Sequence, residues 1–277
     1  MPPRYDLHCH STYSDGVFGP AAVVARARGR GVDVLALTDH DEVSGLGEAE
    51  EAARVAGVTL ICGSEVSVTW EDITIHVVAL GIDPRNPTLI EGLAKNRAGR
   101  SARARRIADA LATAGISGAY DGAMKYVTSE QLISRTHFAR HLVAAGHARD
   151  MKDVFKRYLT RGRPGYVPHQ WAEMSQAVDW IHAAGGQAVV AHPGRYELNA
   201  AGMRRLLTEF RGVGGDAIEV LSSSHTPAQY VEFATHARVL GLRGSSGSDW
   251  HGPDDSWMDL GSLPDMPTGV VPVWNDW

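Results

Sequence analysis

The sequence predicts an α/β barrel of parallel strands, and three observations lead to that prediction. Short apolar segments alternate with amphipathic helical segments over much of the chain. Histidine and acidic residues stand at or just beyond the ends of several apolar segments, where a barrel places its active site. With 277 residues, 44% of them hydrophobic, the chain is long enough for one large barrel domain, with or without an insertion.

The strands and helices of the barrel follow from these patterns. Strands are predicted over 5–8, 33–37, 58–62, 73–80, 187–191, 216–221 and 242–246. Helices are predicted over 20–30, 44–56, 173–184, 200–211 and 228–240. Pro20 is suited to open the first helix, while Ser44 is the expected N-cap of the second and Gly57 its end.

Residues 85–170 break this alternation and carry no strong strand pattern. They are predicted to form a long helix over 88–114, ended by Gly115, and shorter helical pieces over 128–146 and 150–160. We expect 1–84 and 171–277 to form the barrel. Residues 85–170 are then an arginine-rich helical cap over its mouth, inserted in the barrel and not an independent domain.

Charge is segregated between the two parts of the chain. Residues 85–170 contain 16 Lys and Arg against 6 Asp and Glu, whereas the remainder contains 11 against 26. An acidic body suits cations, and a basic insertion suits an anionic substrate. The alternative for many of these arginines is that they are solvated helix faces.

Several protein classes are not expected from the composition. The chain has no apolar segment approaching the ~20 residues of a membrane helix. No apolar stretch precedes the first strand, and Cys9 and Cys62 are too few for a disulfide framework. We therefore expect a cytoplasmic enzyme without a membrane segment. The acidic body also argues against stable binding of duplex nucleic acid.

Nine residues are candidate metal ligands. They are His8, His10, Asp15, His40, Glu65, His76, His192, Asp249 and His251. His8 and His10 are two apart on a strand and therefore share a face, and Asp249 and His251 repeat that spacing. Six imidazoles and three carboxylates suit a cluster of divalent cations better than a single metal.

Glu65 is the candidate bridging ligand, because a carboxylate can hold two ions ~3.5–4 Å apart through its two oxygens. Taken alone, Glu65 is also explained by a surface salt bridge, and His76 is better explained by a core histidine bonded to a backbone carbonyl. The other candidate ligands reverse that preference for His76. Most other histidines fall on predicted helices or loops and are expected at solvent or helix faces: His141, His147, His169, His182 and His236.

Five further residues are candidate substrate contacts. Arg100 and Arg103 are three apart on the long predicted helix and would project from one face. Arg135 and His137 stand in the segment SRTHF, and His225 stands in SSSHTP. Arginine side chains suit a phosphate group that is bound but not cleaved.

Taken together, the motifs resemble those of the polymerase-and-histidinol-phosphatase (PHP) superfamily. The resemblance rests on HCHSTYSDG, ALTDHD, the pair Glu65 and His76, AHPGRY and SGSDWH, in this order. Further segments resemble the 3′,5′-nucleoside bisphosphate phosphatases, a subgroup that includes RNase AM: SRTHFARHL, RGRPGYVPHQW and IEVLSSSH. The resemblance implies a distorted (β/α)7 barrel with a trinuclear metal centre, usually of manganese, and zinc or iron are alternatives.

Carried over by motif, the resemblance implies three ion sites. The first consists of His8, His10, Glu65 and Asp249, the second of Glu65, His76 and His192, and the third of Asp15, His40 and His251. Glu65, Asp15 and His192 are the implied catalytic residues, around a hydroxide held between ions that attacks phosphorus in line.

The expected reaction is hydrolysis of the 3′-phosphate of a nucleoside 3′,5′-bisphosphate, pAp to AMP. Trimming of short single-stranded RNA from its 5′ end is compatible with the same site. Alternatives are a histidinol-phosphate phosphatase, a zinc amidohydrolase and a non-catalytic metal-binding module. Amidohydrolases often use a carbamylated lysine as the metal bridge, but the four lysines, Lys95, Lys125, Lys152 and Lys156, all lie in the insertion.

Overall fold

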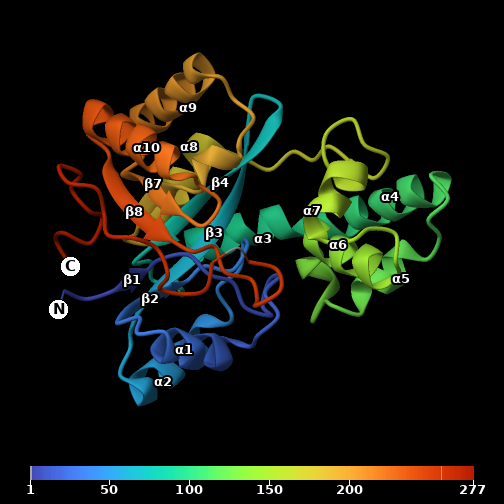
Figure 1. The fold of residues 1–277 in the computed structure, drawn as a ribbon, viewed down its shortest axis with the longest axis horizontal. Helices are drawn as coiled ribbons and strands as arrows, with labels where there is room; N and C mark the ends of the chain where they lie inside the picture. The colour runs from blue at the N-terminus through green and yellow to red at the C-terminus, as the bar shows by residue number, and fades with distance from the viewer. Residues whose placement is uncertain (1, 257) are drawn as a thin grey trace.

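The computed structural model describes residues 2–256 and 258–277. Its strands form a sheet in the order β1-β2-β3-β4-β6-β7-β8, and β5 pairs with β3 beside this path (Figure 1). The strands are β1 (Tyr5–Asp6), β2 (Val34–Leu37), β3 (Thr59–Trp70), β4 (Ile73–Leu80), β5 (Ala172–Glu173), β6 (Gln187–Val190), β7 (Ala217–Ser222) and β8 (Arg243–Gly247).

The sheet curves until its two edge strands meet. Leu7 N donates to Ser246 O at 2.9 Å, and Cys9 pairs with Trp250 in a parallel bridge just beyond β1 and β8. The sheet is thus a nearly closed barrel. Its seven-stranded α/β architecture confirms the predicted fold class.

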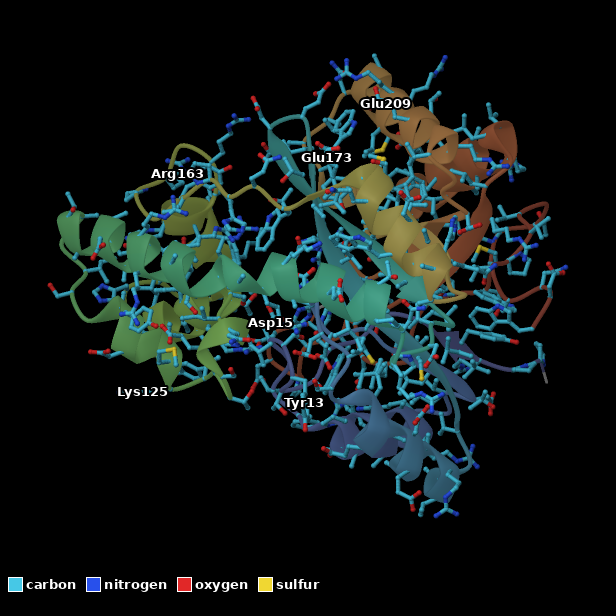
Figure 2. The ribbon with its side chains drawn as sticks, turned by 180° about the vertical axis from the view of Figure 1, so that it is seen from behind. Tyr13, Asp15, Lys125, Arg163, Glu173 and Glu209 are labelled. Carbon is cyan, nitrogen blue, oxygen red and sulfur yellow. The ribbon has the colours of Figure 1, made fainter. Side chains whose placement is uncertain are left out.

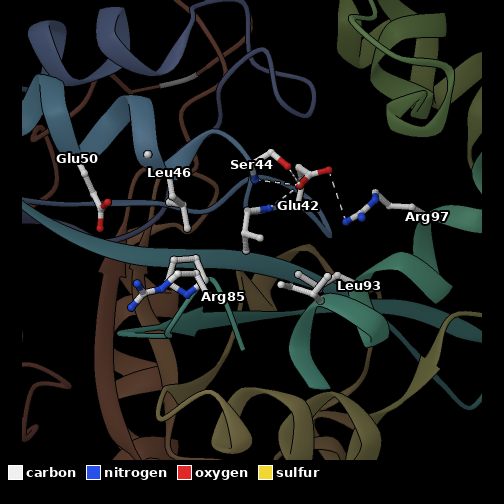
Figure 3. Close-up of a pocket in the computed structure, with 11 residues that line it drawn as sticks. Glu42, Ser44, Leu46, Glu50, Arg85, Leu93 and Arg97 are labelled. Carbon is white, nitrogen blue, oxygen red and sulfur yellow. Dashed lines mark hydrogen bonds and ion pairs between the residues drawn. The ribbon is translucent and has the colours of Figure 1, made fainter. Parts of the chain in front are cut away.

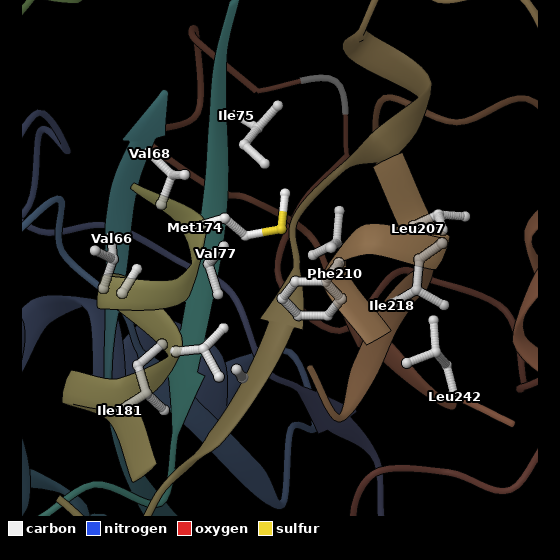
Figure 4. Close-up of a cluster of buried hydrophobic side chains, with 14 of the residues drawn as sticks. Val66, Val68, Ile75, Val77, Met174, Ile181, Leu207, Phe210, Ile218 and Leu242 are labelled. Carbon is white, nitrogen blue, oxygen red and sulfur yellow. The ribbon is translucent and has the colours of Figure 1, made fainter. Parts of the chain in front are cut away.

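Helices cover the outside of the barrel (Figure 1). They are α1 (Pro20–Gly29), α2 (Leu46–Ala56), α8 (Met174–Ala183), α9 (Ala200–Gly212) and α10 (Pro227–Leu240). A large apolar cluster joins β3 and β4 to α8 and α9 and includes Val66, Val77, Ile181 and Phe210, all completely buried (Figure 4). This packing holds the strand ends in fixed positions.

The strand pairing differs from the sequence prediction in one region. β4 runs antiparallel to both β3 and β6, so the barrel is not wholly parallel. β3 also continues to Trp70 instead of ending at 62. Val66 and Val68 alternate with Glu65 and Ser67, which is the pattern of a strand with two different faces, and a tight hairpin then leads directly into β4.

The remaining helices form a group beside the barrel, coloured green and yellow in Figures 1 and 2. They are α3 (Pro87–Ala98), α4 (Arg100–Thr113), α5 (Ala119–Met124), η1 (Glu130–Leu132), α6 (Arg135–Ala144), α7 (Met151–Val154) and the π-helical η2 (Phe155–Leu159). An apolar cluster of their own, including Ile107, Leu111 and Phe138, holds α4 to α6. Asp15 lies where this group meets the barrel, whereas Lys125 and Arg163 lie away from it (Figure 2).

Two helix boundaries correct the sequence predictions. The single helix predicted over 88–114 is broken at Gly99, where an added Cβ would lie 2.3 Å from Cε1 of His169. Ser44 is not an N-cap, because α2 begins later, after Gly45. Glu42 Oε1 accepts the N–H groups of Val43 and Ser44 instead (Figure 3).

Candidate metal centre

The nine predicted ligands converge at one end of the barrel. His8 and His10 follow β1, His40 follows β2, and His192 follows β6, whereas Asp249 and His251 come after β8. Glu65 and His76 lie within the antiparallel pair β3 and β4, and the turn after β1 supplies Asp15. Segments far apart in the sequence therefore deliver their imidazole and carboxylate groups to the same end of the barrel.

Glu65 is at the centre of the cluster and is completely buried. Its Oε1 lies 2.8 Å from His76 Nδ1 and 2.9 Å from His192 Nε2. Its Oε2 lies 2.9 Å from His40 Nδ1 and 3.3 Å from Nε2 of both His8 and His10. The two oxygens of one carboxylate thus face different sets of nitrogens, as a bridging ligand requires.

Asp249 and Asp15 flank Glu65 on either side of His10. Asp249 Oδ1 is 3.1 Å from His10 Nε2 and 3.4 Å from His8 Nε2. Asp15 Oδ1 is 3.2 Å from His251 Nε2 and 3.7 Å from His40 Nε2. The ligands therefore spread into several neighbouring groups around Glu65 rather than surrounding one point.

Three groups of donors lie close enough to hold an ion, with the donor atoms of each within 4.8 Å of one another. They are His8, His10, Glu65 and Asp249; His40, Glu65 and His76; and His10, Asp15, His40 and His251. The first group is the same as the first ion site implied by the resemblance. The third group is the implied site of Asp15, His40 and His251 with His10 added. The group containing His76 includes His40 where the resemblance implies His192, although His192 approaches the same Glu65 oxygen.

The unsatisfied atoms of the cluster fit a bound cation. Asp15 Oδ1, His40 Nδ1, Glu65 Oε2 and His76 Nδ1 are buried and have no hydrogen-bond partner among residues 2–256 and 258–277. His76 Nδ1 and Glu65 Oε1 are nonetheless 2.8 Å apart. Donor atoms that are close without bonding to one another are expected when they are directed at a shared third atom. Buried polar groups are rarely left unpaired without such a reason.

The charges of the cluster also suit cations. Burial raises the pKa of Glu65, but its interactions with His76, His40 and His8 outweigh the burial and hold the pKa well below the usual value. For Asp15, His40 and His251 likewise outweigh the burial and keep the pKa well below its usual range. Burial and Arg195 lower the pKa of His192 to about 3, so its imidazole is neutral, which is the form that binds metal.

Two buried carboxylates behind the ligands were not recognised in the sequence. Glu219, in the middle of β7, accepts a 2.7 Å hydrogen bond from His8 Nδ1 and another from the backbone N–H of His192. Asp39 accepts from Ser14 Oγ, which lies 3.2 Å from His10 Nδ1. Such groups fix the orientation of a ligating imidazole. A charged residue inside the apolar run AIEVL is the same signal that identified His76.

Arg195 is a further residue at the cluster that the sequence did not indicate. It lies in the short helix η3 (Pro193–Arg195) directly after His192. Its Nη2 is 2.5 Å from Asp249 Oδ2, and its side chain is 42% exposed. This guanidinium therefore stands at the open edge of the ligand cluster.

The predicted substrate contacts divide into two kinds. His225 is bonded through both nitrogens, because Nε2 accepts from Gly194 N and Nδ1 lies 3.2 Å from Val220 O. Arg100 forms a buried ion pair with Asp41. These two side chains thus have partners within the protein, and their role as substrate contacts stays a prediction.

Arg103, Arg135 and His137 remain available. Arg103 and Arg135 have no carboxylate ion-pair partner in the described part of the chain, and burial, with Arg135 and Arg100 nearby, lowers the pKa of Arg103 to about 9. His137 Nδ1 accepts from Ser134 N at 2.9 Å, so its proton is on Nε2, which has no partner among the described residues. Ser134 also donates to Asp15 Oδ2 at 3.0 Å, which joins this group to the cluster.

A separate cavity of about 560 Å³ lies between α2 and α3 (Figure 3). It is lined by Glu42, Ser44, Arg85 and Arg97 together with apolar side chains. No predicted ligand is among its lining residues, so we do not assign the chemistry to it.

The fold and the ligand cluster define a barrel of the metal-dependent hydrolase kind. The profile of the PHP domain matches residues 6–189, and the chain belongs to the PHP domain family. This confirms the family expected from the sequence motifs. In the described part of the chain, no helix is both long and apolar enough to span a membrane.

Related proteins agree with this assignment. A 3′,5′-nucleoside bisphosphate phosphatase of Chromobacterium violaceum is 49% identical over 98% of this chain and 95% of its own length. The 5′-3′ exoribonuclease Rnm of Escherichia coli is 44% identical over 99% of this chain and 93% of its own. A 5′-3′ exoribonuclease of Haemophilus influenzae is 43% identical over 99% of both chains.

Solved structures share the fold. A structure from Chromobacterium violaceum, described as an amidohydrolase with bound sulfate and no metal, has a TM-score of 0.95 and 49% identity over 98% of this chain and 94% of that one. A structure from Bifidobacterium adolescentis, described as a candidate metal-dependent phosphoesterase, has a TM-score of 0.82 and 29% identity over 99% of this chain and 94% of that one. The fold is that of the PHP metal-dependent phosphoesterases.

Proposed function

We propose that this protein hydrolyses the 3′-phosphate of nucleoside 3′,5′-bisphosphates, converting pAp to AMP and phosphate. One observation carries the proposal: a cluster of candidate metal ligands lies beside Arg103, which is buried, and Arg135, which is partly buried, and neither arginine has a carboxylate partner in the described chain. The first group suits the phosphate that is cleaved. The second suits a phosphate that is held. The related bisphosphate phosphatase supports this substrate class.

The proposed centre holds up to three divalent cations, with manganese as the expected metal and zinc or iron as alternatives. Glu65 would bridge two of them, with His8, His10 and Asp249 on one side and His76 and His192 on the other. Asp15, His40 and His251 would hold the third. When bound, the cations supply an activated water nucleophile and neutralise charge on the phosphate being cleaved.

The protein residues position the rest of the substrate. Arg135 directly follows Ser134, whose hydroxyl group donates a hydrogen bond to Asp15 of the cluster. Arg135 is therefore next in sequence to a residue that contacts a proposed metal ligand. Arg103 and Arg135 would hold the 5′-phosphate, and His137 would donate from Nε2 to a substrate oxygen. A phosphate-binding pair beside the cluster suits a molecule with two phosphates better than histidinol phosphate, which has one.

The same site accounts for trimming of short RNA from its 5′ end. In 5′-phosphorylated RNA, the first 3′-oxygen–phosphorus bond is the bond that is cleaved in pAp, with the rest of the strand as an additional ester. Relatives from Escherichia coli and Haemophilus influenzae are 5′-3′ exoribonucleases. We therefore propose single-stranded RNA ends as a second substrate.

The other candidates are less well supported. An amidohydrolase with a carbamylated lysine bridge requires a lysine in the cluster, and the four lysines lie on or between the helices beside the barrel. A non-catalytic metal-binding module does not account for arginines next to the ligands that have no carboxylate partner among the described residues.

The test is phosphate release from pAp, AMP, histidinol phosphate and p-nitrophenyl phosphate, and AMP release from short 5′-phosphorylated RNA. Each is measured with Mn²⁺, Zn²⁺ and Mg²⁺, and metal content is determined by elemental analysis. We expect the highest kcat/KM for pAp. A higher kcat/KM for histidinol phosphate than for pAp would overturn the proposal.

A further inference from the structure

Asp41 joins the candidate metal centre to the helices beside the barrel. It directly follows His40, and its backbone N–H donates to the carbonyl of Glu65 at 2.9 Å. Its side chain is completely buried, and its φ of 51° lies in the left-handed region that residues other than glycine rarely adopt. Such a conformation persists when the surrounding structure imposes it.

The carboxylate of Asp41 is bonded to β3 and to the helices beside the barrel, and not to the cluster. Its Oδ1 accepts from Ser67 N at 2.8 Å and from Asn96 Nδ2 at 2.9 Å. Its Oδ2 accepts from Ser67 Oγ at 2.8 Å and forms the ion pair with Arg100. Asn96 is on α3 and Arg100 is on α4, so one carboxylate holds both helices at the Gly99 break.

The returning segment is tied to the same place. Asn96 Oδ1 accepts from Ala172 N at 3.0 Å, and Arg103 Nε donates to Val167 O at 3.1 Å. The Trp171 ring lies 4.9 Å from the Arg100 guanidinium and 5.5 Å from that of Arg103. The chain therefore enters and leaves the helical region through one buried junction centred on Asp41.

We propose that Asp41 is a positioning residue that sets the distance between the metal centre and the Arg103–Arg135 pair. It thereby selects substrates whose two phosphates are spaced as in a nucleoside 3′,5′-bisphosphate. The inference rests on the proposed function. Asp41 neutralises the charge of Arg100. The guanidinium of Arg103, about one turn further along α4, therefore remains to bind an anion.

The test compares Asp41→Asn with the control Asp259→Asn. Asp259 forms a partly buried ion pair with Arg26 of α1, in which Nε and Nη2 of Arg26 each donate to one carboxylate oxygen at 2.8 Å. Kinetics are measured on pAp and on p-nitrophenyl phosphate with saturating Mn²⁺. We expect Asp41→Asn to lower kcat/KM for pAp by about tenfold more than for p-nitrophenyl phosphate, mainly through KM. Asp259→Asn should change both substrates by the same factor.

Equal losses on the two substrates in Asp41→Asn would overturn the proposal, because a purely structural role does not distinguish them. Ser67→Ala removes one donor to Asp41 and should shift the same ratio by a smaller factor, which keeps the test decisive if Asp41→Asn does not fold.

Amide hydrogen exchange over 96–103 and 167–172 should accelerate in Asp41→Asn and not in Asp259→Asn. Unchanged exchange contradicts the junction. If the wild-type protein does not hydrolyse pAp, the proposed function fails and the exchange result alone decides the junction.

Discussion

Ser134 Oγ donates a 3.0 Å hydrogen bond to Asp15 Oδ2, so the N-cap of α6 is bonded directly to a proposed metal ligand. Arg135 and His137 follow within the first turn of that helix. The helices beside the barrel are therefore part of the proposed site.

Replacing Glu65 by Gln should abolish metal retention and activity together. Gln removes the negative charge and one of the two oxygens that face separate sets of imidazoles. We expect kcat to fall by about a thousandfold or more, with fewer bound ions per chain by elemental analysis. Glu91→Gln, on an exposed position of α3, is the matched control. Normal turnover and a full complement of metal in the Glu65 variant would contradict the bridging role.

Replacing Arg135 by Ala should affect substrates with two phosphates selectively. A charge-assisted hydrogen bond contributes about 1.5–3 kcal/mol, so KM for pAp should rise by about 10- to 100-fold. KM for p-nitrophenyl phosphate, which has no second phosphate, should change little. Arg149→Ala, at an 85% exposed side chain, is the control. The same rise in KM for both substrates would argue against a phosphate contact.

Replacing Glu219 by Gln should weaken metal binding without changing any proposed ligand. The amide group cannot accept from both His8 Nδ1 and His192 N, as the carboxylate does. Loss of such a partner typically costs about 10- to 100-fold in metal affinity. Titration of the metal-free protein with Mn²⁺ measures this directly. Unchanged affinity would show that His8 is held by its packing alone.

His225 should make stability depend on pH below neutrality. Burial, together with the charge of Arg195, lowers its pKa to about 4, from 6.5 in the unfolded chain. Its Nε2 accepts from Gly194 N and would lose that bond on protonation. The unfolded state then binds more protons between these values, so stability is complete above pH 6.5 and is lost as the pH falls towards 4. The loss is up to about 3 kcal/mol. Urea unfolding of the metal-free wild type and of His225→Gln, from pH 4 to 8, should show a steeper slope in the wild type, because other buried histidines such as His192 contribute equally to both proteins. Parallel curves would exclude it.

Much of the fold was predictable because each barrel element has a local signal. Apolar strands, helix ends such as Gly57 and polar residues after strands all appear within short windows of sequence. The antiparallel direction of β4 was missed because it depends on which strands lie beside it. β4 pairs with β3 through a hairpin and with β6, which lies about a hundred residues later in the chain. The break at Gly99 depends on the ring of His169, 70 residues later.

The candidate ligands were visible for the same reason, since an imidazole or carboxylate at the end of a buried strand is locally anomalous. Their partners were not. Glu219 and Asp39 acquire a role only through contacts with His8 and, through Ser14, His10. The arginines show this most clearly, because Arg100 and Arg103 are three residues apart on one helix. One is neutralised by Asp41, whereas the other has no carboxylate partner in the described chain.

The sequence by itself determined the family, the barrel class and the identity of the residues that can bind cations, because these depend on residue type and spacing along the chain. Only the tertiary structure decided which oxygen of Glu65 faces which imidazole and which guanidinium is available to an anion. Those properties depend on distance and burial between side chains of different segments of the folded chain, which no local pattern encodes.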